Sequence, residues 1–416
     1  INTPTAWSHG LGGGSLRPLA SLIPLEEAKR LIEANVKPIS KRETVSLSNA
    51  PFRVLAKDVF SNFDVPPYDR SAVDGYAVRA EDTFKAGKFE PVELRCIGAV
   101  HAGELPQRLV RSGECMQIAT GAMIPEGADA VVMVENTERS NNTVQIFRSL
   151  PPGSNISRKG EDIKAGTVVL KEGELLTPSK VGVLAAIGMI EVEVYARPKV
   201  LVVPTGNEVA EVGKPLRPGQ VYDINSHTLS SILMENGCIY VRHSIVEDTA
   251  DALTRVLGRA GEYDMIVLSG GSSAGDRDVL EGVISDLGRV IFHGVQIKPG
   301  KPTIFGVIGD TPVFGMPGYP TACLTNGYVF LAPAVRKMAR LPKKQETIGI
   351  YPMAKKYAAT LGRHQFLTVK VIDGYVYPAF KESGAITSMA HADGWVEVPP
   401  NVDILEKGTK VEVHFF

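Results

Sequence analysis

Two lysines, Lys298 and Lys301, flank a Pro-Gly turn in the segment Lys-Pro-Gly-Lys-Pro. The stiff backbone of this turn holds two ammonium groups close together, and two like charges so placed favour an anion between them. A pair of solvated loop lysines is the alternative, but the strand-like run at 295–297 and the glycine context favour an anion site. A P-loop of a nucleotide hydrolase is excluded, because five residues rather than four separate Gly294 from Gly300 and a proline stands at the Ser/Thr position.

Two glycine-containing turns also follow apolar runs. Residues 269–275, Ser-Gly-Gly-Ser-Ser-Ala-Gly, come after the run 264–268, and a Pro-Gly turn comes after the run 313–316. A strand that enters such a turn and then a helix presents unpaired N–H groups and the positive helix end to one place. Glycine also serves tight turns, but seven residues of nearly only Gly and Ser exceed what a turn requires. We predict that these turns bind a phosphate or an oxyanion through Ser269, Gly270, Gly271, Ser272, Pro317 and Gly318.

Acidic residues recur in the loops after the strand-like runs, at Glu208, Asp223, Asp248, Asp276 and Asp278. Carboxylates near a phosphate site usually hold Mg²⁺, a hard ion that takes oxygen ligands in near-octahedral geometry. Helix N-capping is the alternative, and it is the preferred interpretation of Asp223 or Asp248 taken alone. Because four acid-bearing loops are expected at the same edge of one sheet, the sequence favours a metal site there.

Three further segments, 65–79, 119–125 and 153–162, combine polar side chains with glycine or proline. They are too polar and too rich in these residues for strand interiors, so we predict exposed, ordered loops. Loops are polar in most proteins, and each segment alone therefore says little about function.

The order of the predicted elements divides the chain into regions. One helix is predicted at 24–36, and short β-branched runs predict an all-β domain from 45 to about 162. After residue 197 strands alternate with helices, which predicts a parallel, doubly wound sheet that binds ligands beyond the carboxyl ends of its strands. The predicted strands lie at 199–204, 240–246 and 264–268, and the predicted helices at 226–236, 250–261, 278–287 and 321–340. Alternating runs from 348 onward predict a small β-barrel or sandwich.

Length and composition limit the possible functions. The 416 residues suggest two to four domains. With 45 basic and 46 acidic residues, the chain has no overall field that would recruit nucleic acid or an anionic membrane. The longest uncharged apolar run, 181–190, is too short to span a membrane. The N-terminal residues lack a signal-peptide pattern, and we interpret residues 10–15 as a flexible leader. The cytoplasm is therefore the expected location. The four cysteines lack CxxC or Cys/His spacing, and we interpret them as reduced core thiols.

Taken in order, several motifs resemble those of the MoeA-type molybdopterin molybdenumtransferases, whose relatives include the C-terminal domain of gephyrin. The matching segments are 69–79, 120–130, 160–162, 205–208, 269–271, 298–302 and 317–318. The resemblance extends from about residue 18 to the end of the chain. It implies an enzyme that inserts molybdate or tungstate into adenylylated molybdopterin, with Mg²⁺-dependent release of AMP.

The resemblance also implies an architecture and a set of roles. The fold would be multidomain α/β plus β. An elongated linking domain would comprise 18–45 with 163–195, and a β-rich inserted domain would comprise 46–162. A doubly wound α/β molybdopterin-binding domain would follow at 196–341, and a C-terminal β-barrel at 342–416. The implied catalytic residues are Asp74, Thr120, Asp162, Lys298 and Lys301. The implied Mg²⁺ ligands are Glu208, Asp248 and Asp278. The implied partners are a second copy, whose α/β domain faces the β-rich segment across the active cleft, and a molybdopterin adenylyltransferase that donates the substrate.

The chain departs from the family pattern at two turns. Pro-Gly-Tyr-Pro-Thr-Ala at 317–322 replaces the common Pro-Gly-Asn-Pro-Val-Ser, and Ser-Ser-Ala at 272–274 replaces the usual Val-Ser-bearing run. The backbone turns are expected to remain, while side-chain contacts to ligand change. A peptide-binding scaffold and a molybdopterin carrier without hydrolysis are the alternatives to the enzyme. Retention of the charged motif positions favours the enzyme.

Overall fold

The computed structural model describes residues 22–270, 279–379 and 385–416. The chain divides into two compact units. The first, called here the α/β-containing unit, comprises residues up to 43, 52–54 and 194–416, and the second, the β-rich unit, comprises residues 44–51 and 55–193. The prediction of a multidomain α/β plus β protein is thus confirmed, while the proposed division into four domains stays a prediction.

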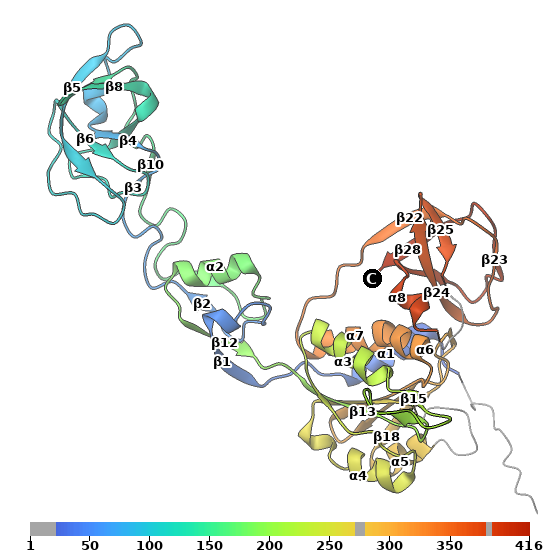
Figure 1. The fold of residues 1–416 in the computed structure, drawn as a ribbon. Helices are drawn as coiled ribbons and strands as arrows, with labels where there is room; N and C mark the ends of the chain where they lie inside the picture. Colours follow the sequence, from blue (N-terminus) through green and yellow to red (C-terminus); the bar gives the residue numbers. More distant parts are fainter. Residues whose placement is uncertain (1–21, 271–278, 380–384) are drawn as a thin grey trace, which may run out of the picture. The chain divides into compact units, whose positions relative to one another are not determined.

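A six-stranded mixed sheet forms the centre of the α/β-containing unit (Figure 1). In spatial order its strands are β16 (Ile239–Arg242), β13 (Lys199–Pro204), β17 (Met265–Ser269), β21 (Thr311–Met316), β20 (Ile304–Ile308) and β18 (Arg289–His293). The first four strands are parallel, whereas β20 is antiparallel to both of its neighbours. The prediction of a parallel sheet is therefore wrong at β20.

A two-residue turn explains the reversed direction of β20. Ile308 pairs with Thr311, so Gly309 and Asp310 alone connect β20 to β21. Gly309 has a φ of +60°, a conformation that glycine adopts without steric cost. A Gly-Asp pair between two short apolar runs is a hairpin signal, and such a turn can join antiparallel strands only.

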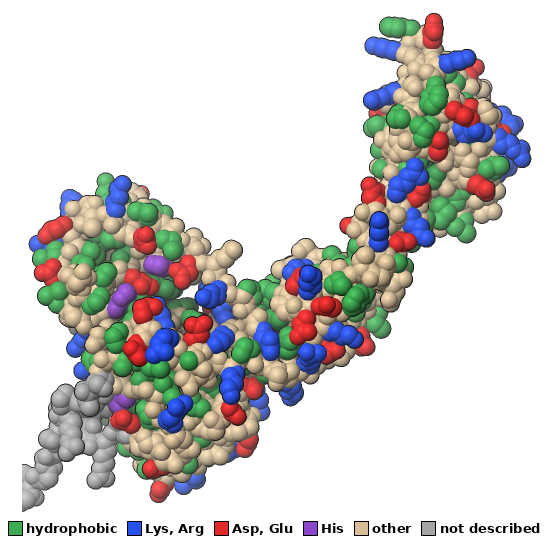
Figure 2. Space-filling view, turned by 180° about the vertical axis from the view of Figure 1, so that it is seen from behind, with side chains coloured by type: hydrophobic (Ala, Val, Ile, Leu, Met, Phe, Trp, Pro, Cys, Tyr) green, Lys and Arg blue, Asp and Glu red, His purple; other side chains and the backbone are tan. Residues whose placement is uncertain are grey.

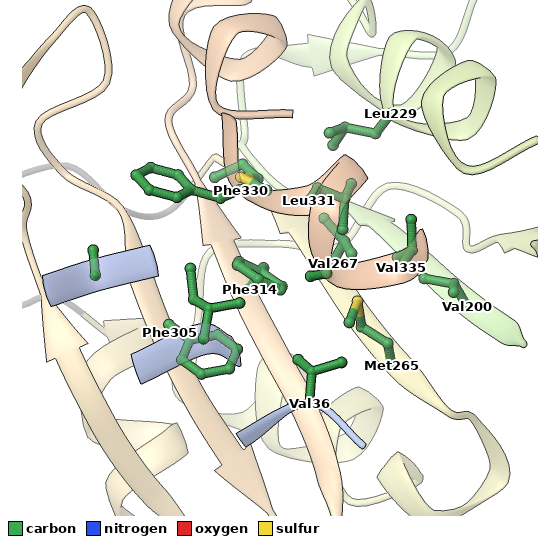
Figure 3. Packing of buried hydrophobic residues seen from close by; sticks show 14 of the residues in the cluster. Val36, Val200, Leu229, Met265, Val267, Phe305, Phe314, Phe330, Leu331 and Val335 are labelled. Carbon is green, nitrogen blue, oxygen red and sulfur yellow. The ribbon is translucent and has the colours of Figure 1, made fainter. Parts of the chain in front are cut away.

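Two hydrophobic clusters cover the two faces of this sheet. Successive residues of a strand point to opposite faces, and accordingly Val200 and Val202 belong to one cluster while Leu201 and Val203 belong to the other. The first cluster contains residues of α1 (Leu25–Asn35), α3 (Asn225–Glu235), α6 (Pro320–Asn326) and α7 (Ala332–Met338) (Figure 3). The second contains residues of α4 (Ala250–Leu257) and α5 (Val279–Leu287). Helices thus cover both faces and leave the edge where the strands end available for a site.

A second six-stranded sheet lies near the C-terminus of the same unit. Its strands are β19 (Ile297–Lys298), β24 (His364–Ile372), β26 (Gly394–Val398), β28 (Lys410–Phe415) and β22 (Ile348–Pro352), with β25 (Tyr375–Pro378) paired to β24. The remaining strands and α-helix of this unit are β14 (Val209–Ala210), β15 (Val221–Tyr222), β23 (Tyr357–Ala358), β27 (Ile404–Leu405) and α8 (Thr387–Ala390). β19, which lies between β18 and β20 in the sequence, pairs with β24 in parallel. The prediction that the run 295–297 ends a strand of the α/β sheet is therefore wrong.

The β-rich unit contains a six-stranded sheet of its own. In spatial order its strands are β7 (Ala130–Met133), β4 (Gly75–Val78), β6 (Glu114–Ile118), β5 (Val92–Val100), β9 (Thr143–Ile146) and β8 (Thr137–Ser140). Smaller elements are β2 (Val59–Phe60), β3 (Arg70–Ser71), β10 (Ile156–Ser157), β11 (Val168–Leu170) and α2 (Pro178–Ala186). Strands β1 (Arg42–Ser46) and β12 (Glu191–Tyr195) lie where the chain passes between the units.

The cysteines are free and buried, as predicted, at Cys96, Cys115, Cys238 and Cys323. Burial raises the pKa of the Cys115 and Cys238 thiols to about 12. Both thiols are therefore protonated and poorly nucleophilic at neutral pH. Among the described residues, no helix has the length and apolar character that crossing a membrane requires.

Candidate functional site

The lysine turn lies at the edge where the parallel strands end. Residues 294–303 connect the end of β18 to the start of β20. Ile304, the first residue of β20, pairs with Gly315 near the end of β21. Because β20 runs against β21, the start of β20 and the ends of β13, β17 and β21 share one edge. The predicted location of Lys298 and Lys301 is therefore correct, although a different strand leads to it.

The two lysines of this turn are half-buried. The Nζ atom of Lys298 donates a hydrogen bond to Thr360 Oγ1 at 2.7 Å. Within the described part of the chain, Lys301 has no side-chain hydrogen bond and neither lysine forms an ion pair. A cation that loses part of its hydration without gaining a counter-charge is unfavourable. A bound anion would supply that counter-charge, so the geometry supports the predicted anion site.

The face drawn in Figure 2 carries charged side chains of both signs. Figure 2 shows acidic and basic side chains interspersed over the visible face, without an extended patch of one sign. This distribution agrees with the formal net charge of −1. Attraction of an anion must therefore come from local groups such as the lysine turn.

Asn326 fixes the backbone of the lysine turn. Its fully buried Nδ2 atom donates to the Gly300 carbonyl oxygen at 3.1 Å, and Thr303 Oγ1 donates to the same oxygen at 2.8 Å. Gly300 has a φ of +104°, and a Cβ atom there would lie 2.3 Å from Asn326 Oδ1. The sequence motifs do not indicate Asn326, for which the local signal is an amide in the apolar segment after Pro320.

We expect Gly300→Ala to destabilise the turn. The substitution combines an unfavourable positive φ with a steric overlap, and we expect it to lower the free energy of unfolding by about 2–3 kcal/mol. Gly309→Ala is the matched control, because Gly309 also has a positive φ but a Cβ there would meet nothing within 4 Å. Thermal unfolding of both variants measures the difference. Equal losses would show that the contact with Asn326 contributes nothing.

The ends of β17 and β21 form the second part of the site. The Ser269 carbonyl oxygen accepts from the Thr205 N–H at 2.9 Å, and the Gly270 N–H donates to the Met316 carbonyl oxygen at 3.2 Å. A Cβ atom on Gly270, whose φ is +97°, would lie 2.5 Å from the Thr205 carbonyl oxygen. The glycine is therefore required by close packing at the strand ends. Gly271 and Ser272 lie outside the described residues.

Asn225 connects the start of α3 to the turn at Pro317 and Gly318. Its Nδ2 atom donates to the Gly318 carbonyl oxygen at 2.8 Å. Its Oδ1 atom is buried and has no hydrogen-bond partner among the described residues. A Cβ atom on Gly318 would lie 3.8 Å from the Gly270 Cα atom, so the turns at 270 and 318 are neighbours. Ser269, Gly270, Pro317 and Gly318 thus come together as predicted. Asn225, which no sequence motif indicates, joins them.

The acidic residues have different surroundings. Asp223 is buried and caps α3, because its Oδ1 atom accepts from the Ser226 N–H at 3.0 Å. Thr249, rather than Asp248, caps α4 through its hydroxyl group, so the capping alternative is right for Asp223 and wrong for Asp248. The segments that carry Glu208 and Asp248 lie side by side, since the Val246 N–H donates to the Pro204 carbonyl oxygen at 2.9 Å.

The side-chain chemistry of the acidic residues is suited to a magnesium ion. Glu208 and Asp248 lie in the loops that follow two neighbouring strands, β13 and β16, and carboxylate oxygens are the ligands that Mg²⁺ prefers. Among the described residues, no group of three or more His, Cys, Asp or Glu side chains is placed to hold a metal. Asp276 and Asp278 lie outside the described residues. The assignment of Glu208, Asp248 and Asp278 to a metal therefore stays a prediction.

The β-rich unit brings Asp74 and Thr120 together. Asp74 precedes β4 and Thr120 follows β6, and these strands pair with each other. The Thr120 N–H donates to Asp74 Oδ1 at 2.7 Å. This hydrogen bond from the Thr120 backbone, followed by the contribution of its side chain, lowers the pKa of Asp74 below its ordinary value of 3.8. Asp162 is exposed, and within the described residues it forms no hydrogen bond with either of them.

Comparison with known proteins identifies the family. The chain matches the MoeA N-terminal region (domain I and II) over residues 23–188, a domain described as a probable molybdopterin binding domain over 201–337, and the MoeA C-terminal region (domain IV) over 351–416. It is 34% identical to molybdopterin molybdenumtransferase 2 of Mycobacterium tuberculosis, over 94% of this chain and 98% of the relative. The chain belongs to the MoeA family of molybdopterin molybdenumtransferases.

Further relatives agree with this assignment. The molybdopterin molybdenumtransferase of Haemophilus influenzae is 36% identical over 76% of this chain and 78% of its own length. Two crystal structures of MoeA molybdopterin biosynthesis proteins from Pyrococcus horikoshii match with a TM-score of 0.81 each. They are 41% and 32% identical, and the matches cover 95% of this chain and 99% and 100% of theirs. As a member of the family, the chain is a transferase of molybdenum cofactor biosynthesis that handles molybdopterin, and the resemblance drawn from the motifs is confirmed.

Proposed function

We propose that this chain inserts molybdate or tungstate into adenylylated molybdopterin and releases AMP in a Mg²⁺-dependent reaction. Family membership supports the class of reaction. The observation that carries the finer proposal is the pair of half-buried lysines at the carboxyl edge of the sheet, which have no ion-pair partner among the described residues. A tetrahedral dianion and a phosphate both fit such a pair of cations.

Different residues at the sheet edge bind different parts of the substrates. Lys298 and Lys301 hold the oxyanion, and the turns at Gly270 and Gly318 bring backbone close to the substrate phosphate. The Asn225 Oδ1 atom offers an acceptor to a donor on the substrate. Glu208 and Asp248 would hold Mg²⁺. When bound, this ion supplies positive charge that offsets the charge of the departing AMP phosphate.

Asp74 supplies a carboxylate that stays ionised at neutral pH. The Thr120 N–H fixes its orientation and lowers its pKa. An ionised and oriented carboxylate can accept a hydrogen bond from the water that attacks the phosphoanhydride and draw its proton away. Hydrolysis of the phosphoanhydride consumes one water and gives AMP and the pterin phosphate. In the insertion that follows, the two dithiolene sulfurs bond to the metal, and one oxo group of the oxyanion leaves as water with the two thiol protons.

AMP release from adenylylated molybdopterin tests the proposal directly. The assay contains Mg²⁺ and either molybdate or tungstate, and it also measures the metal-loaded cofactor. Oxyanion-dependent AMP supports the proposal and shows which oxyanion is used. Bound pterin without AMP would instead support a carrier, or a scaffold if a peptide is captured and pterin is not. The altered turn at 317–322 would then be the first segment to examine.

We also propose that the working form is a homodimer and that a molybdopterin adenylyltransferase supplies the substrate. The candidate residues support the first part, because Asp74 and Thr120 belong to the β-rich unit while the lysines belong to the α/β-containing unit. A site assembled from two copies would use both groups. Sedimentation of the purified protein gives its oligomeric state, and a monomer that turns over would contradict the homodimer.

A further inference from the structure

The backbone of Lys298 forms part of the C-terminal sheet. It is the second residue of β19, which pairs in parallel with β24, so that Ile297 is opposite His364 and Lys298 is opposite Gln365. The backbone just before this pairing is also joined, because the His364 N–H donates to the Gln296 carbonyl oxygen at 2.9 Å. The position of the Lys298 Cα atom is thus set by a sheet whose other strands come from the last part of the chain.

The Lys298 side chain is held by a residue of the same region. Its Nζ atom donates to Thr360 Oγ1 at 2.7 Å, across 62 residues of sequence. Lys301 has no comparable partner among the described residues. A lysine side chain has several freely rotating bonds and loses conformational entropy when it is ordered. A hydrogen bond made before the substrate arrives removes part of that cost from binding.

Thr360 is itself fixed by a partly buried polar network. Its N–H donates to Gln365 Oε1 at 3.3 Å, and Gln365 Nε2 donates to the Tyr357 hydroxyl oxygen. Gln365 is 3% exposed, and burial raises the pKa of Tyr357. Tyr357 belongs to β23, which pairs with β27. The Thr360 hydroxyl is therefore attached to two ordered strands rather than to a free loop.

We propose that Thr360 is a positioning residue for the reaction, and that the C-terminal sheet acts through its hydroxyl group to hold the Lys298 ammonium group ready for the anion. The inference rests on the proposed function, since it assigns the oxyanion or phosphate as the group that Lys298 contacts. Thr360 itself acts through Lys298 and does not need to touch the substrate.

Thr360→Val and Thr360→Ser separate positioning from packing. Valine keeps the shape and removes the hydroxyl, whereas serine keeps the hydroxyl. We expect Thr360→Val to raise the KM for molybdate about tenfold with a smaller change in kcat. We expect Thr360→Ser to remain within about twofold of the unsubstituted protein. Thr368→Val is the matched control, because the buried Thr368 Oγ1 atom has no hydrogen-bond partner among the described residues.

A double-mutant cycle tests whether Thr360 acts through Lys298. Adding Thr360→Val to Lys298→Met should cause no further loss, because the ammonium group that Thr360 holds is already absent. A full additional tenfold rise in KM would overturn the inference. A KM in Thr360→Val equal to that in Thr368→Val would overturn it as well.

Chemical labelling gives a readout that does not depend on turnover. Acetylation of Lys298 by an N-hydroxysuccinimide ester, followed by mass spectrometry, should be about two- to fivefold faster in Thr360→Val than in the unsubstituted protein. An unchanged rate would overturn the positioning role even if the enzyme is active. Faster acetylation together with no oxyanion-dependent AMP release from the unsubstituted protein would contradict the proposed function and, with it, the catalytic purpose of the contact. The two failures are therefore distinguishable.

Discussion

Replacement of Lys301 by alanine is expected to lower oxyanion-dependent AMP release by about 10²–10³-fold. Lys301 is half-buried and forms no ion pair within the described residues, so its charge is available to the substrate. The loss should be largest in kcat/KM for the oxyanion. The measurement is AMP formed at a series of molybdate concentrations, with thermal unfolding to show that the fold is kept.

Two variants sharpen the test of Lys301. Lys301→Arg keeps the positive charge and should recover part of the activity, although its planar guanidinium group has a different shape. Lys344→Ala is the control for removing a lysine from the same unit, since Lys344 pairs on the surface with Glu235. Normal turnover of Lys301→Ala would remove the main support for an anion site at this turn.

Replacement of Asp74 by alanine is expected to lower AMP release by about 10²–10⁴-fold, because a positioned proton acceptor is lost. Asp74→Asn keeps an oxygen that can accept from the Thr120 N–H but removes the charge. It should therefore keep the local structure and lose most of the activity. Asp82→Ala is the control, because Asp82 also accepts a backbone N–H in the β-rich unit, from Gly113 at 2.9 Å. Activity of Asp74→Asn close to normal would show that the charge is not needed.

The pH dependence of this effect follows from the lowered pKa of Asp74. The hydrogen bonds from Thr120 favour the ionised carboxylate, so their stabilising contribution is present above the ordinary pKa of 3.8 and is lost as the pH falls through the lower pKa of the folded protein. Asp74 therefore stays ionised throughout the neutral range. Protonation of Asp74 should cause no fall in AMP release between pH 8 and about pH 5.

Mixing two inactive variants tests whether one site draws on two copies. If the sites of a homodimer are shared, Asp74→Ala and Lys301→Ala chains that exchange freely should form mixed dimers with one intact site. Equal amounts should then recover about a quarter of the normal activity. No recovery, with exchange shown by differently tagged chains, would place both groups in the site of a single copy.

Local patterns predicted most of the α-helices. Helix α1 was expected at 24–36 and is found at Leu25–Asn35, and α5 was expected at 278–287 and is found at Val279–Leu287. Apolar residues at helical spacing report such elements because burial of one face stabilises them. The lysine turn lies at the predicted edge, but the strand-like run 295–297 on which that prediction depended belongs to the C-terminal sheet.

The missed features depend on partners distant in the sequence. β19 has two residues, too few to show any periodicity, and its partner strand begins at His364. Asn225 and Asn326 act through hydrogen bonds to Gly318 and Gly300, which no local pattern reveals. The reversed β20 could have been predicted, because the Gly-Asp hairpin signal is local. The distinction between Asp223 and Asp248 required the observed caps.

The pairing of β19 with β24 has a consequence for the independence of the molybdopterin-binding segment. The chain leaves the central sheet after β18, adds one short strand to the C-terminal sheet and returns as β20. A fragment that ended near residue 341 would keep β19 but lack every strand that pairs with it, and its Lys298 would lack Thr360. The segment taken alone would therefore lose two contacts that the C-terminal sheet and its neighbouring residues supply.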